Sequence, residues 1–264
     1  MIAIDVASPF FAPFKLVLIL GLLIAMPAVV AFGLFLEFFL FRRLYDRSHL
    51  DQVLATFGLM LILTEGVRMV WGSSPIFVGV PDALSGSIRL LGIINYPVYR
   101  IAIIVTGLAV AVGLYVLINH TRAGMLLRAG ASNRPVVSAL GVNITWLFAA
   151  VFAFGAMLAG FAGAMVAPVL SVDPGMGESV LILAFVVVVI GGIGSVKGAF
   201  VAALVVGVVD TLGRTFGPIL LQMVMDPSAA SQTGRTLAPM LIYILMAVVL
   251  AIRPSGLFGR RGAA

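Results

Sequence analysis

The chain has 264 residues, of which 62% are hydrophobic and 10% charged, and its net charge is +6 at pH 7. An average soluble domain has about 45–50% apolar and about 25% charged residues. This composition excludes an ordinary soluble enzyme, because the apolar side chains exceed what a globule of this size can bury. It also excludes a disordered chain, which needs few apolar residues and many charges. The sequence therefore predicts an all-α polytopic membrane protein, a helix bundle forming a single transmembrane domain over residues 1–264.

Apolar runs of about 20 residues mark the candidate membrane spans. In chain order, the seven expected segments are 14–41, 50–71, 98–119, 144–168, 179–190, 199–212 and 237–252. The first segment is long and contains Pro27, which predicts a kink or a strong tilt within one helix. The segments 179–190 and 199–212 are short, since 12 apolar residues cover only about 18 Å. These two segments either cross the membrane fully or form a re-entrant hairpin.

Lys and Arg residues set the expected orientation, because cytoplasmic loops carry an excess of them. With the basic C-terminal tail inside, alternation of the spans places ten cationic residues in the cytoplasm and five outside, and Arg68 lies within a span. We therefore expect the N-terminus outside and the C-terminus in the cytoplasm. The polar stretch 72–97 is then an outer loop, and the stretch 120–143 is a cytoplasmic one.

The residue types give no support for catalytic or cofactor chemistry. The chain has no cysteine, and its two histidines, His49 and His120, are expected to be solvated loop residues. We therefore expect no metal site, no cofactor and no catalytic residue. Residues 191–198 do not form a phosphate-binding loop, which requires Gly-x-x-x-x-Gly-Lys followed by Ser or Thr, so an ATPase would be a separate polypeptide. The glycines expected to form a tight bend here are Gly191, Gly192 and Gly194.

Ionisable residues inside a span are costly and are therefore candidate functional sites. Thr64, Glu65 and Arg68 lie near the outer end of the second expected span. Glu65 and Arg68 are three residues apart, which places them on one helix face. The group either lines a substrate path or forms a local ion pair, and we favour the ion pair.

Two further charged side chains in the expected spans have cationic neighbours along the chain. Asp210 is four residues before Arg214, so an ion pair within the helix is expected. Glu37 lies near the cytoplasmic end of the first span, where we expect it to pair with Arg42 or Arg43.

Small residues spaced four positions apart predict close helix packing, because they let two backbones approach. In the segment 144–168, Gly155 and Gly163 lie on one such stripe, and Ala156 and Gly160 lie on the stripe beside it. The pattern predicts a compact bundle and does not distinguish a transporter from a channel.

The stretch 121–143 is the most informative part of the chain. It begins with a short amphipathic helix pattern, which Asn133 and Pro135 interrupt, and Gly141 to Asn143 end the pattern before the next span. A helix of this kind at the cytoplasmic face either docks a soluble partner or is a connector that lies on the surface.

Ordered motifs along the chain match one family. They are R-A-G-A-S-N-R at 128–134, A-L-G-V-N at 139–143, and the runs at 50–59, 191–199 and 253–259. On these residues the chain resembles the permease subunits of branched-chain (hydrophobic) amino-acid ABC importers, the Liv-type permeases. The resemblance implies the fold of an ABC importer permease, in which 121–143 couples to the ATPase. The coupling residues that it implies are Arg128, Ala129, Ala131, Asn133, Arg134, Gly141 and Asn143.

The resemblance also implies partners and a location. The expected partners are two cytoplasmic ABC ATPase subunits, a second related permease, a periplasmic substrate-binding protein and the lipid bilayer of the bacterial inner membrane, with no nucleic acid. Similar permeases serve urea or short amides, and a self-sufficient channel or secondary carrier is the remaining alternative. Such permeases usually begin with a further apolar stretch that Met1 to Pro13 does not resemble. We therefore expect either an internal start on a truncated chain or a bundle that lacks this part.

Overall fold

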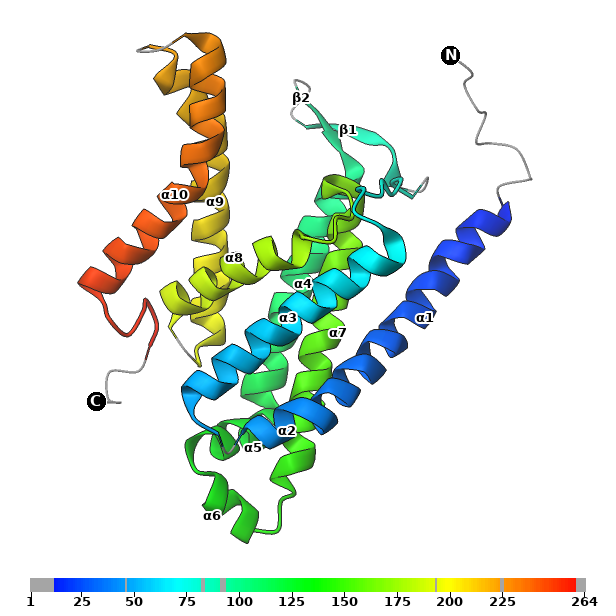
Figure 1. Ribbon diagram of the computed structural model, residues 1–264, viewed down its shortest axis with the longest axis vertical. Helices are drawn as coiled ribbons and strands as arrows, with labels where there is room; N and C mark the ends of the chain where they lie inside the picture. Colours follow the sequence, from blue (N-terminus) through cyan, green and yellow to red (C-terminus); the bar gives the residue numbers. More distant parts are fainter. Residues whose placement is uncertain are drawn as a thin grey trace. The chain divides into compact units, whose positions relative to one another are not determined.

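The computed structural model describes residues 12–45, 47–81, 84–90, 94–192, 194–223 and 226–259 (Figure 1). The chain forms two compact units, Met1–Pro174 and Gly175–Ala264. Apart from one short β-hairpin and an isolated bridge, the regular structure of the described residues is helical. The predicted all-α architecture is thus confirmed.

The N-terminal helix is continuous through its proline. Helix α1 (Ala12–Leu36) contains Pro27 and passes directly into a π-helical turn, η2 (Glu37–Phe41), and then into the short helix α2 (Arg42–Leu44). Residues 24–44 are long and apolar enough to cross a membrane. The first apolar run therefore forms one helix with an internal proline, as predicted.

Two long helices follow, α3 (His49–Trp71) and α4 (Val98–His120). The backbone N–H of Asp51 donates to the Ser48 hydroxyl at 3.2 Å, which caps the start of α3. Gly72 ends the helix with a φ of +85°, a conformation that favours glycine.

The loop between α3 and α4 contains a β-hairpin that the composition did not predict. Strand β1 (Ser87–Leu90) pairs antiparallel with β2 (Ile94–Pro97), with Ser87 opposite Pro97. The strands have only four residues each. They are therefore too short to show the long alternation of apolar and polar residues that predicts a strand.

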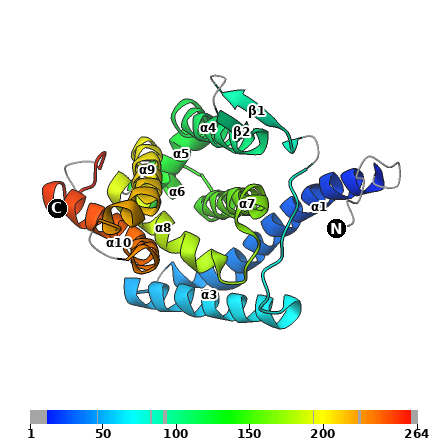
Figure 2. The same ribbon diagram turned by 90° about the horizontal axis from the view of Figure 1, so that it is seen from above.

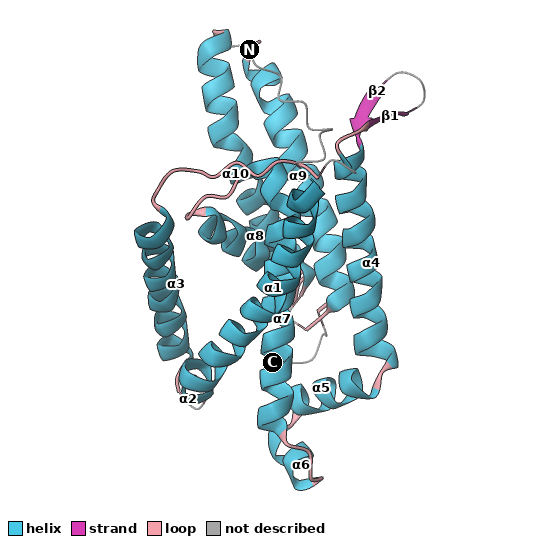
Figure 3. Ribbon diagram, turned by 90° about the vertical axis from the view of Figure 1, so that its right-hand side faces the viewer, coloured by secondary structure: helices cyan, strands magenta, loops and turns pink. Residues whose placement is uncertain are grey.

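Two short helices, α5 (Arg122–Ser132) and α6 (Arg134–Ala139), connect α4 to α7 (Ile144–Leu170). The predicted short helix and its interruption at Asn133 are both confirmed. Figure 3 shows α5 and α6 at the end of α4 that is opposite the β-hairpin. The segment 121–143 is therefore an ordered element with its own shape.

Helix α1 packs against α7 through small residues. A Cβ atom on Gly33 would lie 2.8 Å from the Cβ of Ala156, and one on Gly160 would lie 3.1 Å from a methyl group of Val29. The predicted stripe of Ala156 and Gly160 is therefore a helix interface. A Cβ on Gly155, in the other stripe, would meet nothing within 4 Å.

Replacing Gly33 with alanine is expected to push α1 away from α7. Added volume in a packed contact costs about 1–3 kcal/mol. In Gly155→Ala, the matched control, the new methyl group meets open space. Both changes improve helix propensity equally. The difference between the thermal unfolding midpoints of the two variants therefore measures the effect of the packing contact. Equal stability of the two variants would contradict this account of the α1–α7 interface.

The second unit contains α8 (Met176–Gly191), α9 (Val196–Leu221) and α10 (Pro227–Ile252). The helices pack on one another around a small apolar core, and partly buried side chains such as Leu245 and Leu257 cover it. The buried residues of this core are Val186, Ile190, Ala202, Val206 and Ile242.

The prediction of a short apolar segment over 199–212 is wrong. Helix α9 has 26 residues and extends about 39 Å, because the helix continues past the apolar run through Arg214 and Thr215 to Leu221. The continuation packs closely on α10, where a Cβ on Gly234 would lie 2.7 Å from the backbone nitrogen of Pro218. Helix α10 likewise starts ten residues before 237, and it bends along its length, with Pro239 inside it (Figure 1).

Among the described residues, five helices are long and apolar enough to cross a membrane. They are α1 with its continuation to Leu44, α3, α4, α7 and α9. Two further apolar helices are shorter, namely α8 and the part of α10 from Pro239 onward. The 16 residues of α8 extend about 24 Å, against a hydrocarbon core of about 30 Å.

Candidate functional site

Capping side chains build the connector between α4 and α7. The Oδ1 atom of Asn133 accepts a hydrogen bond from the backbone N–H of Val136 at 3.3 Å, and Asn143 caps α7 in the same way at 3.2 Å. The Ala129 carbonyl accepts from the backbone N–H of Asn133 at 3.0 Å. Side-chain caps of this kind fix where a helix begins. Three predicted coupling residues thus set the shape of the connector.

Close contact holds α5 against the end of α4. The guanidinium of Arg128 donates to the carbonyl of Ile118, and a Cβ on Gly124 would overlap that same carbonyl. Gly141 has a φ of +84°, which turns the chain after α6. Arg128 therefore supports the fold of the connector, in addition to any role at its surface. The predicted coupling residues whose side chains lie outside the described part are Ala131 and Arg134.

The connector also exposes apolar side chains, which the motif did not single out. Met125 is 56% exposed, Val136 is 54% exposed and Leu140 is 77% exposed, whereas Val137 is buried. Val136 and Leu140 are four residues apart, so they lie on one side of α6 and the turn that ends it. Adjoining exposed apolar side chains are typical of a protein contact surface. The sequence carries a signal for them, namely apolar residues in a loop that is otherwise polar.

Two predicted ion pairs are present within single helices. Arg68 Nη1 lies 3.0 Å from Glu65 Oε1. The neighbouring residue Thr64 is half-buried. Arg214 Nε lies 2.8 Å from one carboxylate oxygen of Asp210 and 2.9 Å from the other. Each charge is thus compensated on its own helix, and neither pair requires a partner from another element.

The prediction that Glu37 pairs with Arg42 or Arg43 is wrong. Glu37 is only 3% exposed, and its Oε1 atom has no hydrogen-bond partner in the part of the chain that the structure describes. The guanidinium of Arg42 lies over the ring of Phe38, 5.5 Å from its centroid, and Arg43 donates to the Phe39 carbonyl at 3.2 Å. Because η2 packs against α7, Glu37 is buried while both arginines remain on the exposed side.

The chain bends at two of the glycines named above, and a second motif packs against this bend. Gly192 and Gly194 have φ values of +93° and +83°. The backbone N–H of Leu257 donates to the Ile190 carbonyl at 2.8 Å, and that of Phe258 donates to the Gly191 carbonyl at 3.1 Å. We call this contact between residues 190–192 and 255–259 the glycine interlock.

The interlock leaves no room for side chains at its centre. A Cβ on Gly192 would lie 2.6 Å from the backbone nitrogen of Gly259, and one on Gly256 would lie 2.6 Å from the Cα of Gly192. A Cβ on Gly191 would lie 2.5 Å from the carbonyl carbon of Gly198, at the start of α9. Two motifs that are more than fifty residues apart in the sequence therefore form one structure that ties α8, α9 and the end of α10 together.

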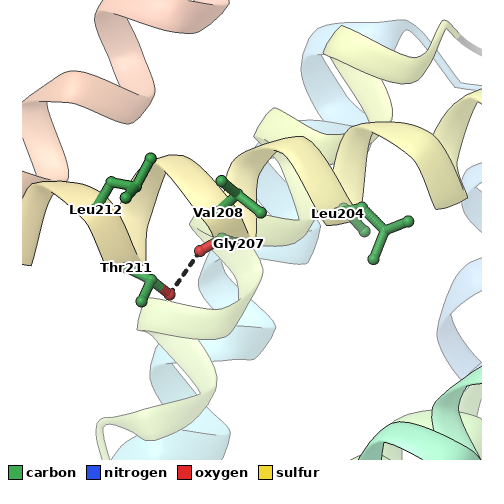
Figure 4. A pocket seen from close by; sticks show the side chains of 6 residues that line it. Leu204, Gly207, Val208, Thr211 and Leu212 are labelled. Carbon is green, nitrogen blue, oxygen red and sulfur yellow. Dashed lines mark hydrogen bonds between the residues drawn. The ribbon is translucent and has the colours of Figure 1, made fainter.

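An open groove of about 440 Å³ runs along one face of α9 (Figure 4). The hydroxyl of Thr211 donates to the Gly207 carbonyl at 2.8 Å, so the polar group in the groove is satisfied within the helix. The groove is therefore an apolar surface that offers few polar contacts to a ligand. Its lining residues are Ala203, Leu204, Gly207, Val208, Thr211 and Leu212.

Similarity to known proteins agrees with these features. The chain matches the family model of the branched-chain amino acid transport system permease component over residues 1–250. It is 29% identical to the high-affinity branched-chain amino acid transport system permease protein BraD of Pseudomonas aeruginosa, over 87% of this chain and 71% of that protein. It is 26% identical to the permease protein LivH of Escherichia coli K12, over 87% of this chain and 70% of that protein.

No solved structure matches the chain. The family match nevertheless covers nearly the whole sequence, namely all of the first compact unit and residues 175–250 of the second, with the helical connector and the glycine bend. The chain belongs to the family of branched-chain amino acid transport system permease components.

Proposed function

We propose that this chain is the membrane-spanning permease subunit of an ATP-binding-cassette importer in the bacterial inner membrane. It translocates branched-chain or other hydrophobic amino acids, while separate subunits bind and hydrolyse ATP. The observation that carries the proposal is the family match over residues 1–250. The ion pairs within α3 and α9 are consistent with it, since they compensate charge locally and form no proton relay across the bundle.

The exposed helices favour a partner within the membrane. Within the first unit, helix α3 lies apart from α4 and α7 (Figure 2) and makes no extended packing contact with another described helix, and the most apolar stretches of α3 and α4 contain no buried residue. Helices in lipid associate through packing of such surfaces. In the proposed importer, lipid and a second, related permease cover them.

The connector of α5 and α6 is the proposed contact with the ATPase. Its helices are capped, a hydrogen bond from Arg128 joins it to the end of α4, and its exposed apolar side chains remain available to a partner. Motion of a bound ATPase would therefore reach α4 and α7 through this element. The proposal places the connector and the C-terminus in the cytoplasm, and the N-terminus and the β-hairpin outside.

Affinity purification of the tagged chain in mild detergent, followed by mass spectrometry of the retained proteins, tests the proposal. The expected result is an ABC ATPase and a second permease in the eluate. A folded chain that purifies alone would favour the self-sufficient channel or carrier instead.

A further inference from the structure

A pocket of about 280 Å³ lies where the end of α3 meets the loop after α7. Two loops form its frame and are joined by an isolated antiparallel bridge, in which Ile76 and Val172 exchange backbone hydrogen bonds of 2.9 and 2.8 Å. Ser171, with a φ of +65°, turns the chain from α7 into this bridge. The side chains that form most of the lining are Val67, Trp71, Ser74, Ile76, Val172 and Asp173.

The electrostatics of the pocket favour a cation. Helices α3 and α7 both end beside it, and the last carbonyls of a helix have no partner within the helix and carry about −0.5 of a unit charge. The exposed Asp173 adds a carboxylate with roughly four acceptor positions, so it accepts from a ligand in addition to any bond within the protein. Arg68, in the last turn of α3, does not cancel this charge, because Glu65 pairs with it at 3.0 Å.

The rest of the pocket is apolar. Val67 and Trp71 are four residues apart on one face of α3, and Ile76, Val172 and Pro174 face the same space. Pockets for drug-sized ligands have volumes of about 300–1,000 Å³, so a pocket of about 280 Å³ suits a smaller molecule. A ligand that satisfies both parts of the pocket carries an ammonium group and a short aliphatic chain.

We propose that this pocket is an outer subsite that holds a hydrophobic amino acid by its ammonium group and side chain before translocation. The inference rests on the proposed importer function, and it names the place where the substrate first contacts this chain. Asp173 and the two helix ends receive the ammonium group, and Val67 and Trp71 receive the aliphatic side chain. Thr64 lies one turn before Val67 on the same face of α3, so the subsite leads toward the predicted polar group of that helix.

Cysteine protection in spheroplasts tests the subsite. The chain has no cysteine, so Ser74→Cys introduces a single thiol into the pocket of the full chain within its complex. An impermeant maleimide added outside is expected to label this thiol. Leucine at about ten times its dissociation constant should slow the labelling about tenfold. The matched control, Ser87→Cys on the exposed strand β1, should label at the same rate with and without leucine.

Two further arms identify what the pocket recognises. The compound 4-methylpentanoate keeps the side chain and the carboxylate of leucine but lacks its amino group, and it is expected not to protect. Adding Asp173→Asn to Ser74→Cys should abolish protection by leucine. Protection by 4-methylpentanoate equal to that by leucine, or unchanged protection in the double variant, would overturn the assignment of the ammonium site.

The outcomes separate the subsite from the importer function. ATP-dependent leucine uptake by the parent cells, without protection at position 74, overturns the subsite and leaves the importer intact. Absence of that uptake contradicts the importer itself. If the substrate-binding protein protects the thiol at position 74 in the absence of leucine, the pocket is a docking surface for that protein, and the proposal is overturned. Labelling of this thiol only after the membrane is permeabilised also overturns it.

Discussion

Gly192→Ala is expected to destabilise the second unit severely. A left-handed conformation costs an L-residue about 1–2 kcal/mol, and Gly192 has a φ of +93°. The new Cβ would also lie 2.6 Å from the backbone nitrogen of Gly259 and 2.8 Å from the Ser255 carbonyl oxygen, so the backbone must move. Such overpacking costs about 1–3 kcal/mol. We expect a loss of about 2–5 kcal/mol, measured as a lower midpoint of thermal unfolding in detergent.

Gly194→Ala is the matched control for the interlock. Gly194 has a similar φ of +83°, but a Cβ there would meet nothing within 4 Å. Gly194→Ala therefore has the free-energy cost of a positive φ in alanine but not the steric clash expected for Gly192→Ala. If Gly194→Ala destabilises the protein as much as Gly192→Ala does, the C-terminal motif does not close over the bend as described.

Leu140→Asp is expected to uncouple the ATPase without unfolding the permease. Leu140 is 77% exposed, so its replacement removes little packing within this chain. Burial of a leucine in a contact contributes about 1.5–3 kcal/mol, and a carboxylate in its place would be desolvated without a partner. We expect retention of the ATPase during purification, and uptake with it, to fall by about ten- to a hundredfold, since each 1.4 kcal/mol corresponds to a factor of ten.

Ser138→Asp controls for charge at the same connector. Ser138 is also exposed, and its replacement adds a carboxylate without removing an apolar contact. Membrane insertion and the gel-filtration profile should match those of the parent chain for both variants. Full ATPase retention in Leu140→Asp, or an equal loss in Ser138→Asp, would argue against an apolar coupling surface on α6 and the turn after it.

Local physical chemistry explains which features were predictable. The long apolar helices α1, α3, α4 and α7 follow from apolar runs, because a helix that crosses lipid requires a continuous apolar stretch. The bend at Gly192 follows from the conformational freedom of glycine, and the breaks at Asn133 and Asn143 follow from the preference of asparagine for helix starts. Each of these signals lies within a few residues of the structure that it specifies.

Features that depend on distant contacts were not predictable in this way. The extension of α9 beyond Leu212 packs on α10 near Gly234, a contact that no local pattern shows. The burial of Glu37 depends on the π-helical turn that packs η2 against α7. The glycine interlock forms by contact between the motif around Gly256 and the bend at Gly192, which are far apart in the sequence. The pocket at Asp173 likewise forms between two loops that are distant in the sequence.

The central claim is that this chain is the permease of an ATP-driven importer, and leucine uptake into proteoliposomes tests it most directly. The complex is reconstituted with its substrate-binding protein, with ATP at the face that carries the ATPase. We expect leucine to accumulate against its gradient. Accumulation should stop when any one of ATP, the ATPase or the substrate-binding protein is omitted. Flux of leucine through liposomes that contain this chain alone, without ATP, would contradict the claim.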